Sequence, residues 1–309
     1  MTAHVVVGAG PVGTAVARRL AAGDEPVTLL SRSGAGPELP GVRRGTVDAA
    51  DPAALTAAAA GADVLHLCVN PPRYDLWAQQ WPPMAAAFLA AAEATGAVLA
   101  MVGNLYPYGP VDGPMREGMP DRAPGAKARL RAAITAEAMA RHHAGRIRAV
   151  EVRASDFVGS SADSHLDRVL PRALSGRPVR MIGAVDRPHS WTWVEDVARA
   201  LVTAAGSEAA HGRVWHVPTN PPRSQRDAVH DHCRAAGIPA VPVRVVPHLA
   251  LRAAALVQRH LGELEETRYQ FVRPYVLDSA ASEAALGLRP TPWDEICRAN
   301  VARLAAARG

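Results

Sequence analysis

A glycine-rich turn between an apolar run and a helix-forming segment constrains the fold of this chain of 309 residues more than any other feature. Residues 4–7 read His-Val-Val-Val, the composition of a buried strand, and glycines follow at positions 8, 10 and 13. Residues 14–22 are then rich in helix-forming Ala, Val, Arg and Leu. The order strand, glycine turn, helix predicts the first unit of a parallel sheet.

The same alternation continues through the first half of the chain. Strand-like runs at 27–30, 64–69, 98–102 and 148–152 are separated by alanine-rich helical segments. This pattern predicts an α/β protein with a Rossmann-type, doubly wound parallel sheet that is covered by helices on both faces. We expect the sheet domain to occupy residues 1–155.

After residue 155 the pattern loosens, and Pro and Gly punctuate it. Only residues 191–205 and 213–217 read as further strand or helix of the same sheet, so we expect 186–217 to return to the first domain. Residues 156–185 and 218–309 should form a smaller, mixed substrate-binding lobe. Because no repeat and no low-complexity linker is visible, the two lobes should interleave in sequence.

Composition excludes several functional classes. The apolar fraction of 49% and the charged fraction of 20% are those of a folded globular protein. Polar residues interrupt the longest nearly apolar stretch, 84–102, so it predicts a helix plus a strand and no membrane span. The net charge is +5, but the arginines are interleaved with acids and alanines, which predicts no nucleic-acid partner.

The N-terminal residues and the cysteines bear on the compartment. The chain starts Met-Thr-Ala-His-Val-Val-Val without a basic export signal. Cys68, Cys233 and Cys297 are irregularly spaced, match no metal motif and would leave one thiol over from any disulfide pairing. We therefore expect a cytoplasmic protein with reduced thiols and without a metal site.

The run Gly8-Ala9-Gly10-Pro11-Val12-Gly13 matches the G-x-G-x-x-G pattern of dinucleotide-binding sheets. In this pattern the first glycine permits the tight turn, the second admits a pyrophosphate, and the third allows helix and strand to pack closely. The helix N-terminus, which begins with Pro11 and Val12, faces the anion. A glycine-rich turn without a ligand is the alternative, but the position between strand and helix favours a nucleotide.

The end of the second predicted strand bears on which dinucleotide binds. An NAD-selecting carboxylate is missing there, and Ser31 and Arg32 stand in its place. A guanidinium can hold a 2′-phosphate, so the sequence favours NADP(H) over NAD(H). Arg32 can also be a solvated loop residue. Asp48 closes the third strand and can accept a hydrogen bond from adenine or cap the next helix.

Several further segments resemble one family. In chain order they are Gly8–Gly13, Val47-Asp48, Val69-Asn70-Pro71-Pro72, Tyr108-Gly109, residues 153–159, residues 193–198 and Pro290-Thr291-Pro292-Trp293. Their order and spacing are similar to those of extended and atypical members of the short-chain dehydrogenase/reductase superfamily, which are related to nucleotide-sugar epimerases and dehydratases. The resemblance implies a Rossmann fold that carries NAD(P) and a C-terminal lobe that closes over the substrate. The motifs and the resemblance assign the cofactor to Gly8, Gly10, Pro11, Val12, Gly13, Ser31, Arg32, Asp48, Val69, Asn70, Pro71 and Lys127.

The chain departs from this family at the catalytic position. The resemblance implies a Tyr-x-x-x-Lys pair, yet Lys127 is the only lysine among 34 basic residues, and no tyrosine precedes it at that spacing. Counting back from Arg153 places Lys127 at the tyrosine position and Arg131 at the lysine position. Asn104 then takes the place of the usual Ser or Thr, and Tyr106 that of an active-site glutamate in some dehydratases.

We expect Tyr106, Lys127 and Asn104 to carry the catalysis. Tyr106 is the best-placed hydroxyl acid, Lys127 can stabilise an oxyanion or donate a proton, and Asn104 can donate to the same oxygen. The like charge of Arg131 and partial desolvation would favour loss of the lysine proton. Each residue has an alternative role without catalysis. Lys127 can be an exposed helix residue, Tyr106 can pack as an aromatic side chain, and Asn104 can bond to the backbone of its loop.

The substrate should lie in the crevice beyond the carboxyl ends of the strands. Aromatic residues cluster after the Asn-Pro-Pro turn, and they favour an apolar or ring-bearing substrate over a phosphate-rich one. Core packing is the alternative role for these aromatic residues. The residues expected to bind substrate are Tyr74, Trp77, Tyr108, Asp156, Phe157 and His189.

These observations favour an NADP-dependent oxidoreductase that acts on a small carbonyl, enone or sugar-like compound. Two alternatives stay open: a non-redox lyase, epimerase or cyclase on the same fold, and a non-catalytic NADP-binding regulator. The expected partner is a small-molecule substrate, with no nucleic acid and no membrane. If the chain self-associates, we expect a homodimer.

Overall fold

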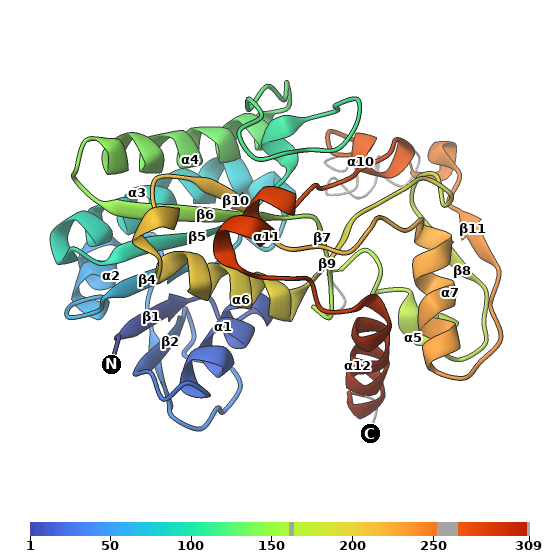
Figure 1. Ribbon diagram of the computed structural model, residues 1–309, viewed down its shortest axis with the longest axis horizontal. Coiled ribbons are helices and arrows are strands. Elements are labelled where there is room, and N and C mark those ends of the chain that lie inside the picture. Colours follow the sequence, from blue (N-terminus) through green and yellow to red (C-terminus); the bar gives the residue numbers. More distant parts are fainter. Residues whose placement is uncertain (161–163, 252–264, 308–309) are drawn as a thin grey trace.

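A parallel sheet of seven strands forms the N-terminal part of the molecule (Figure 1). The computed structural model describes residues 1–160, 164–251 and 265–307. From one edge to the other, the strands are β10 (Val214–His216), β6 (Arg148–Ala154), β5 (Val98–Asn104), β4 (Val64–Leu67), β1 (His4–Val7), β2 (Val27–Ser31) and β3 (Val42–Thr46). The strand order reverses between β1 and β4, and this confirms the predicted doubly wound sheet.

Helices cover both faces of the sheet (Figure 1). On one face lie α1 (Pro11–Ala21) and α6 (Val194–Ala205). On the other face lie α2 (Pro52–Ala58), α3 (Trp77–Thr95) and α4 (Ala126–His143). Every residue of β1 and β4 is buried, as expected for strands between two helical layers.

Short 3₁₀ turns, η1 (Tyr74–Leu76) and η2 (Tyr106–Tyr108), follow β4 and β5 at the carboxyl edge of the sheet; a third, η3 (Glu208–Ala210), precedes β10. The nearly apolar stretch 84–102 divides between α3 and β5, which confirms the predicted helix and strand. Within the described ranges, no helix is both long and apolar enough to cross a bilayer.

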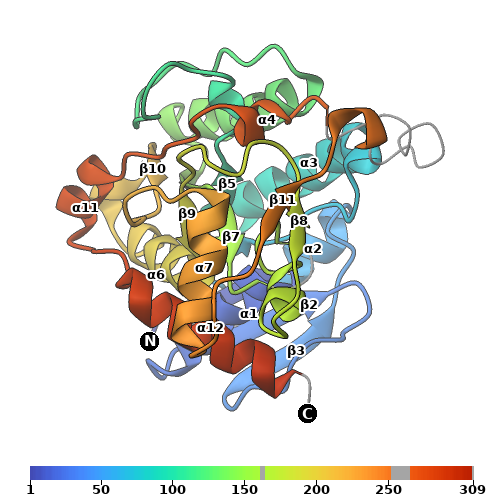
Figure 2. The ribbon, with the colours of Figure 1, turned by 90° about the vertical axis from the view of Figure 1, so that its right-hand side faces the viewer.

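A second lobe packs around its own apolar core (Figure 2). Two small parallel sheets belong to this lobe: β7 (Asp156–Val158) with β9 (Trp191–Trp193), and β8 (Val179–Met181) with β11 (Val243–Val245). Its helices are α5 (Leu170–Ala173), α7 (Gln225–Ala235), α10 (Tyr269–Val272) and α12 (Trp293–Ala306), while α11 (Ala280–Leu286) lies beside β10.

One expectation about the main sheet is wrong. Residues 191–193 do not join it but form β9 beside β7, because β10 already occupies the edge next to β6. The following helix α6 does pack on the main sheet, and β10 is its edge strand, as expected. The three cysteines are free, as predicted.

Candidate functional site

The glycine loop lies where the strand order reverses, at the end of β1. Gly8 has a φ of +113°, and a Cβ at this position would lie 2.5 Å from the carbonyl oxygen of Cys68. A Cβ on Gly13 would lie 1.8 Å from the carbonyl oxygen of Gly8. Both close approaches therefore require glycine, and they hold the start of α1 against the ends of β1 and β4.

Gly10 has the opposite surroundings. It is exposed, and no atom lies within 4 Å of the position of a Cβ there. Helix α1 starts directly after it with Pro11, and no side chain caps the helix. The backbone amides of the first turn therefore stay available to an anion that approaches over Gly10.

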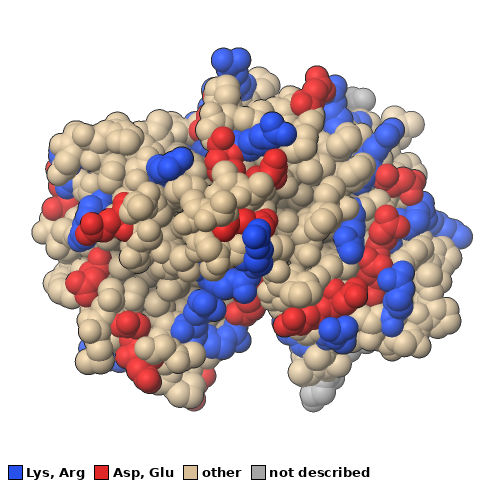
Figure 3. Space-filling model, in the orientation of Figure 1, with Lys and Arg blue, Asp and Glu red and all other residues tan. Residues whose placement is uncertain are grey.

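A groove of about 530 Å³ runs beside this loop, between α1 and the second lobe. Figure 3 shows the corresponding hollow between the two lobes, with basic and acidic residues mixed on the visible surface. The groove is lined by Ala9, Gly10, Pro11, Thr14, Arg18, Gly159, Ser160, Trp193, Val194, Glu195, Ala299 and Arg303.

The residues predicted to select the dinucleotide lie on the loops after β2 and β3. Arg32 is exposed, and none of the ion pairs between described residues involves it. Ser31 donates its hydroxyl to the carbonyl of Ala35 at 2.7 Å. Asp48 accepts the amide of Ala50 at 2.9 Å within the turn after β3. It does not cap the next helix, because Asp51 is the N-cap of α2 and accepts the amides of Ala53 and Ala54.

The loop after β4 holds the remaining residues predicted to bind the cofactor. Val69 packs against the core on the α3 face of the sheet, and Pro71 is buried. Asn70 is exposed next to the glycine loop, and its side-chain amide donates to the carbonyl of Pro71 at 3.1 Å. The loop thus presents one polar side chain to solvent at the switch point.

Lys127 and Arg131 both point inward from the first turns of α4, each with only 5% of its side chain exposed. The ammonium of Lys127 lies 3.0 Å from Glu266 Oε2, and the backbone amide of Lys127 donates to Glu266 Oε1 at 2.7 Å. Its Nζ also lies 5.6 Å from the centre of the Tyr74 ring. The lysine therefore belongs to the site interior and not to an exposed helix face.

Arg131 lies deeper in the same site. Its guanidinium stacks on the Trp81 ring at 4.2 Å and donates from Nη2 to the carbonyl of Val102 at 2.8 Å. Its Nε and Nη1 have no hydrogen-bond partner among the described residues. Burial lowers the pKa of Arg131 from its ordinary value. Two buried donors thus lack an acceptor within the described protein, and such groups are rare in native structures.

Tyr74 and Tyr106 meet through their hydroxyl groups, with the oxygens 2.5 Å apart. Burial raises the pKa of Tyr74 to about 12. Burial, the charge interaction with Tyr74 and the nearby Asp156 raise the pKa of Tyr106 well above its ordinary value. Both phenols therefore keep their protons at neutral pH. Asn104 accepts the amide of Tyr106 through Oδ1 at 3.1 Å and so holds η2 in place.

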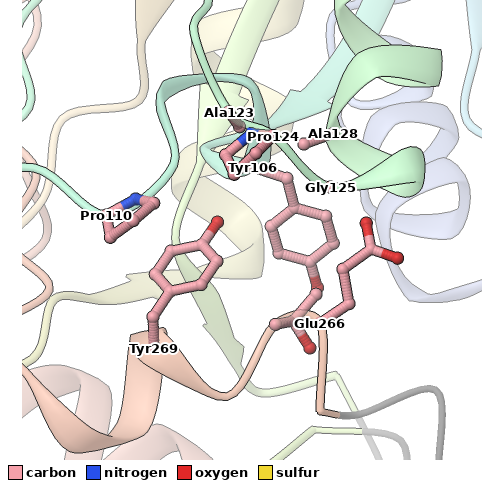
Figure 4. A pocket seen from close by; sticks show the side chains of 9 residues that line it. Tyr106, Pro110, Ala123, Pro124, Gly125, Ala128, Glu266 and Tyr269 are labelled. Atoms are coloured by element: carbon pink, nitrogen blue, oxygen red, sulfur yellow. The ribbon is translucent and has the colours of Figure 1, made fainter.

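Tyr106 opens onto a cavity of about 260 Å³ at the carboxyl edge of the sheet (Figure 4). Tyr269 from α10 and Glu266 line it together with apolar residues of the loop before α4. The hydroxyl of Tyr269 is buried and has no partner among the described residues. The complete lining is Tyr106, Pro110, Ala123, Pro124, Gly125, Ala128, Glu266, Thr267 and Tyr269.

Asp156 and His189 form a second pair near this cavity. His189 Nε2 lies 2.8 Å from Asp156 Oδ2, and Nδ1 faces the carbonyl of Gln270 at 3.2 Å. Burial opposes ionisation of Asp156, but the hydrogen bond and charge of His189 outweigh it and lower the pKa of this carboxyl. Phe157 packs against the core beside α1.

Two more of the predicted substrate residues, besides Phe157, lie in the core. Tyr108 is 3% exposed, lies under the Arg153 guanidinium at 4.8 Å, and places its hydroxyl 2.8 Å from His216 Nε2. Trp77 is also 3% exposed and packs between Trp81 and the tyrosine pair. The structure therefore brings Tyr74, Asp156 and His189 towards the cavity, whereas Tyr108 and Trp77 pack in the core.

Glu266 and Tyr269 were not identified from the sequence. Glu266 is 139 residues from Lys127 and lies in no recognisable motif. The one available signal is physical: an inward-facing lysine needs a buried counter-ion, and this requirement does not say which of the 29 acidic residues supplies it.

The doubly wound sheet and the glycine loop at its switch point define the class of dinucleotide-binding α/β proteins. The family model described as NAD dependent epimerase/dehydratase family matches residues 4–217. This chain therefore belongs to that family of enzymes, which act with a nicotinamide cofactor. A comparison with curated protein sequences finds no match.

Solved structures share the fold over the whole chain. MoeE5 in complex with UDP-glucose and NAD is 19% identical, with a TM-score of 0.78, and the match covers 99% of this chain and 100% of that one. DesIV, a dTDP-glucose 4,6-dehydratase from Streptomyces venezuelae, is 19% identical with a TM-score of 0.77 and coverages of 100% and 98%. The dTDP-glucose 4,6-dehydratase of Bacillus anthracis is 13% identical with a TM-score of 0.79 and coverages of 99% and 97%.

The residues present fit a nicotinamide dinucleotide. The glycine loop leaves open space only at Gly10, where a pyrophosphate would approach, and the first turn of α1 has no side-chain cap to displace. The loop thus offers an anion cradle at the switch point of the sheet.

Proposed function

We propose that this enzyme is an oxidoreductase that prefers NADP(H) and acts on a small carbonyl, enone or sugar-like compound. The observation that carries the proposal is the cavity lined by Tyr106 and Glu266, beside Lys127 and at the same sheet edge as the glycine loop. Proton-carrying side chains and a dinucleotide cradle on one edge are the two parts that carbonyl reduction requires.

The preference for NADP(H) rests on the loop after β2. Arg32 is exposed there, and no carboxylate occupies the position that would accept hydrogen bonds from an unmodified ribose. The loop lies against the glycine loop, since a Cβ on Gly36 would be 3.0 Å from the Ala9 side chain. A guanidinium in this place can form charge-assisted hydrogen bonds with a 2′-phosphate.

When bound, a nicotinamide cofactor would supply the hydride chemistry. Tyr74 can donate its proton to Tyr106, which leaves the Tyr106 proton free to point at a substrate oxygen in the cavity. The ammonium of Lys127 supplies positive charge next to these phenols and stabilises negative charge that develops on that oxygen. Because the phenols are hard to ionise, we assign them hydrogen-bond donation and assign the proton reservoir to Lys127.

The charges of the site favour an uncharged substrate. Glu266 lines the cavity and is paired with Lys127, so a diphosphate in this cavity would meet a carboxylate whose counter-charge is already balanced. Most of the remaining wall is apolar or aromatic. It consists of Pro110, Ala123, Pro124, Gly125, Ala128, Thr267 and the rings of Tyr106 and Tyr269. A cyclic alcohol or ketone matches this lining, with Tyr269 as partner for one of its oxygens.

Oxidation of NADPH with a panel of cyclic ketones, enones and aldehydes tests the proposal. We expect turnover in the wild type, and a loss of about 100-fold or more in kcat/KM for Lys127→Met, the size of a lost general acid. Arg129→Met removes an exposed cation from the same helix and should change kcat/KM less than about two-fold. Substrate conversion without net oxidation of NADPH, or wild-type turnover in Lys127→Met, would contradict the proposal.

A further inference from the structure

Glu266 makes two contacts with one residue. Its Oε1 accepts the backbone amide of Lys127 at 2.7 Å, and its Oε2 lies 3.0 Å from the ammonium of the same lysine. The residue before α4 is Gly125, which has no side chain to cap the helix. The first contact of Glu266 takes the place of this missing cap. One carboxylate thus both begins the helix and balances the charge that the helix carries into the site.

The chain leaves room for this carboxylate in a specific way. A Cβ on Gly125 would lie 2.3 Å from Glu266 Oε1, so any other residue at position 125 would push the carboxylate away. The charge of Lys127 is 95% shielded from solvent, and a buried ammonium is strongly disfavoured unless an anion pairs with it. The same side chain therefore caps the helix start and pairs with the charge of the lysine.

The pair also joins the two lobes. Lys127 belongs to the helix that covers the sheet, whereas Glu266 precedes α10 in the C-terminal part of the chain, 139 residues away. The lysine reaches its ionic partner only when these two parts are packed together. The protonation of the lysine is consequently coupled to the packing of the C-terminal segment on the sheet domain.

We propose that Glu266 is the positioning residue of this active site: it keeps Lys127 protonated and aims its ammonium at the tyrosine pair. The catalytic part of this inference rests on the proposed function, but the ionic part does not. Among the residues that the structure describes, the titratable groups that face Lys127 or its immediate neighbours are Glu266 before α10, Tyr74 in η1, Tyr106 in η2, Arg131 on α4, Asp156 in β7 and Tyr269 in α10. Glu266 is the nearest anion to the ammonium among these groups.

The composition permits a direct test, because Lys127 is the only lysine of the chain. Protein labelled with ¹³Cε-lysine gives one side-chain signal, whose chemical shift follows protonation of this amine alone. We expect the titration midpoint in Glu266→Gln to fall by about 1–3 pH units relative to the wild type, the effect of losing an adjacent opposite charge. Gln keeps the shape and an oxygen that can accept the backbone amide.

Glu265→Gln is the matched control. Glu265 is 59% exposed, contacts His248 and Arg268, and should leave the midpoint unchanged. Glu266→Asp serves if Glu266→Gln does not fold: the shorter acid keeps the charge but cannot hold both contacts, so the midpoint should fall by less. An unchanged midpoint in a folded Glu266→Gln protein, or an equal fall in Glu265→Gln, overturns the inference.

The pH profile of turnover separates this inference from the proposed function. If the inference and the proposed function both hold, the alkaline limb of the pH profile of kcat in Glu266→Gln moves to lower pH. The shift equals that of the titration midpoint of the lysine. If the titration moves but Lys127→Met keeps wild-type turnover, the proposed function fails and the ionic role of Glu266 stands. If turnover depends on Lys127 but Glu266→Gln moves neither the alkaline limb of the pH profile nor the titration midpoint of the lysine, Glu266 is not the positioning residue of Lys127.

Discussion

The hydroxyl oxygens of Tyr74 and Tyr106 lie 2.5 Å apart, although the two tyrosines follow different strands of the sheet. Tyr74 comes from η1 after β4, and Tyr106 from η2 after β5. Parallel strands end at the same edge, so the two turns meet there. Since only Tyr106 lines the cavity, its proton is the one that can reach a substrate, and Tyr74 decides where that proton points.

The two tyrosines should respond differently to loss of the hydroxyl group. Tyr106→Phe removes the hydrogen-bond donor to the substrate oxygen and should lower kcat/KM by about 100-fold or more. Tyr74→Phe leaves this donor in place and should lower kcat/KM by only about ten-fold, the scale of one neutral hydrogen bond. Steady-state kinetics on the two variants checks this order, and equal losses in both would contradict it.

Selection of NADP(H) should depend on Arg32. We expect Arg32→Ala to weaken NADPH binding by about 10–100-fold, since charge-assisted hydrogen bonds contribute roughly 1.5–3 kcal/mol, while NADH binding changes little. Calorimetric titration with both nucleotides measures the two effects.

Arg44→Ala is the control for this substitution. Arg44 is held on β3 by Glu38 and the carbonyl of Gly36, and its removal should not change the ratio of the two affinities. A wild-type protein that binds NADH as tightly as NADPH, or an Arg32→Ala variant with an unchanged ratio, would refute the proposed selectivity.

A buried histidine pair at the other end of the sheet should make folding sensitive to acid. His4 Nδ1 and His66 Nε2 lie 3.0 Å apart, and burial, with a small contribution from His4, lowers the pKa of His66 to about 3. The unfolded chain binds this proton near pH 6.5 and the folded chain does not. The free energy of unfolding should therefore fall between pH 6.5 and pH 3 by about 1.4 kcal/mol per pH unit for this group.

Denaturant unfolding at several pH values tests this expectation. His66→Gln removes the titrating group. Below pH 6.5, the slope of the free energy of unfolding against pH should therefore decrease by the amount that corresponds to about one bound proton. His143→Gln changes an exposed histidine and should leave the slope as in the wild type. An equal slope in wild type and His66→Gln would mean that the pair does not stay neutral in the folded protein.

Sequence reasoning recovered the features that local chemistry determines. The glycine loop, the alternation of strands and helices, and the division of 84–102 into helix and strand all follow from patterns within about twenty residues, and all are observed. The count from Arg153 also identified two inward-facing residues of α4, Lys127 and Arg131. These predictions needed no knowledge of what lies across the sheet edge.

The parts that sequence reasoning did not reach depend on pairings between distant segments. The pattern at 191–193 favours a strand of the main sheet. These residues pair with 156–158 instead, because the sheet edge is taken by β10, further along the chain. Tyr108 lies in a segment that resembles the family, and Trp77 follows the Asn-Pro-Pro turn. Packing against His216 and Trp81 nevertheless places both in the core. Glu266 carries no local signal at all, because its role arises only when α10 packs beside α4.

Binding of NADPH to wild type and Gly10→Asp is the measurement that tests the central claim most directly. Gly10 has a φ of −76° and open space around it, and Asp is favoured at a helix N-cap, so the variant should fold with an unchanged or higher melting temperature. Its carboxylate would take the amides of α1 and repel the pyrophosphate. The account predicts tight calorimetric binding in the wild type and none in Gly10→Asp, and it is contradicted if the wild type gives no binding heat or the variant binds NADPH equally well.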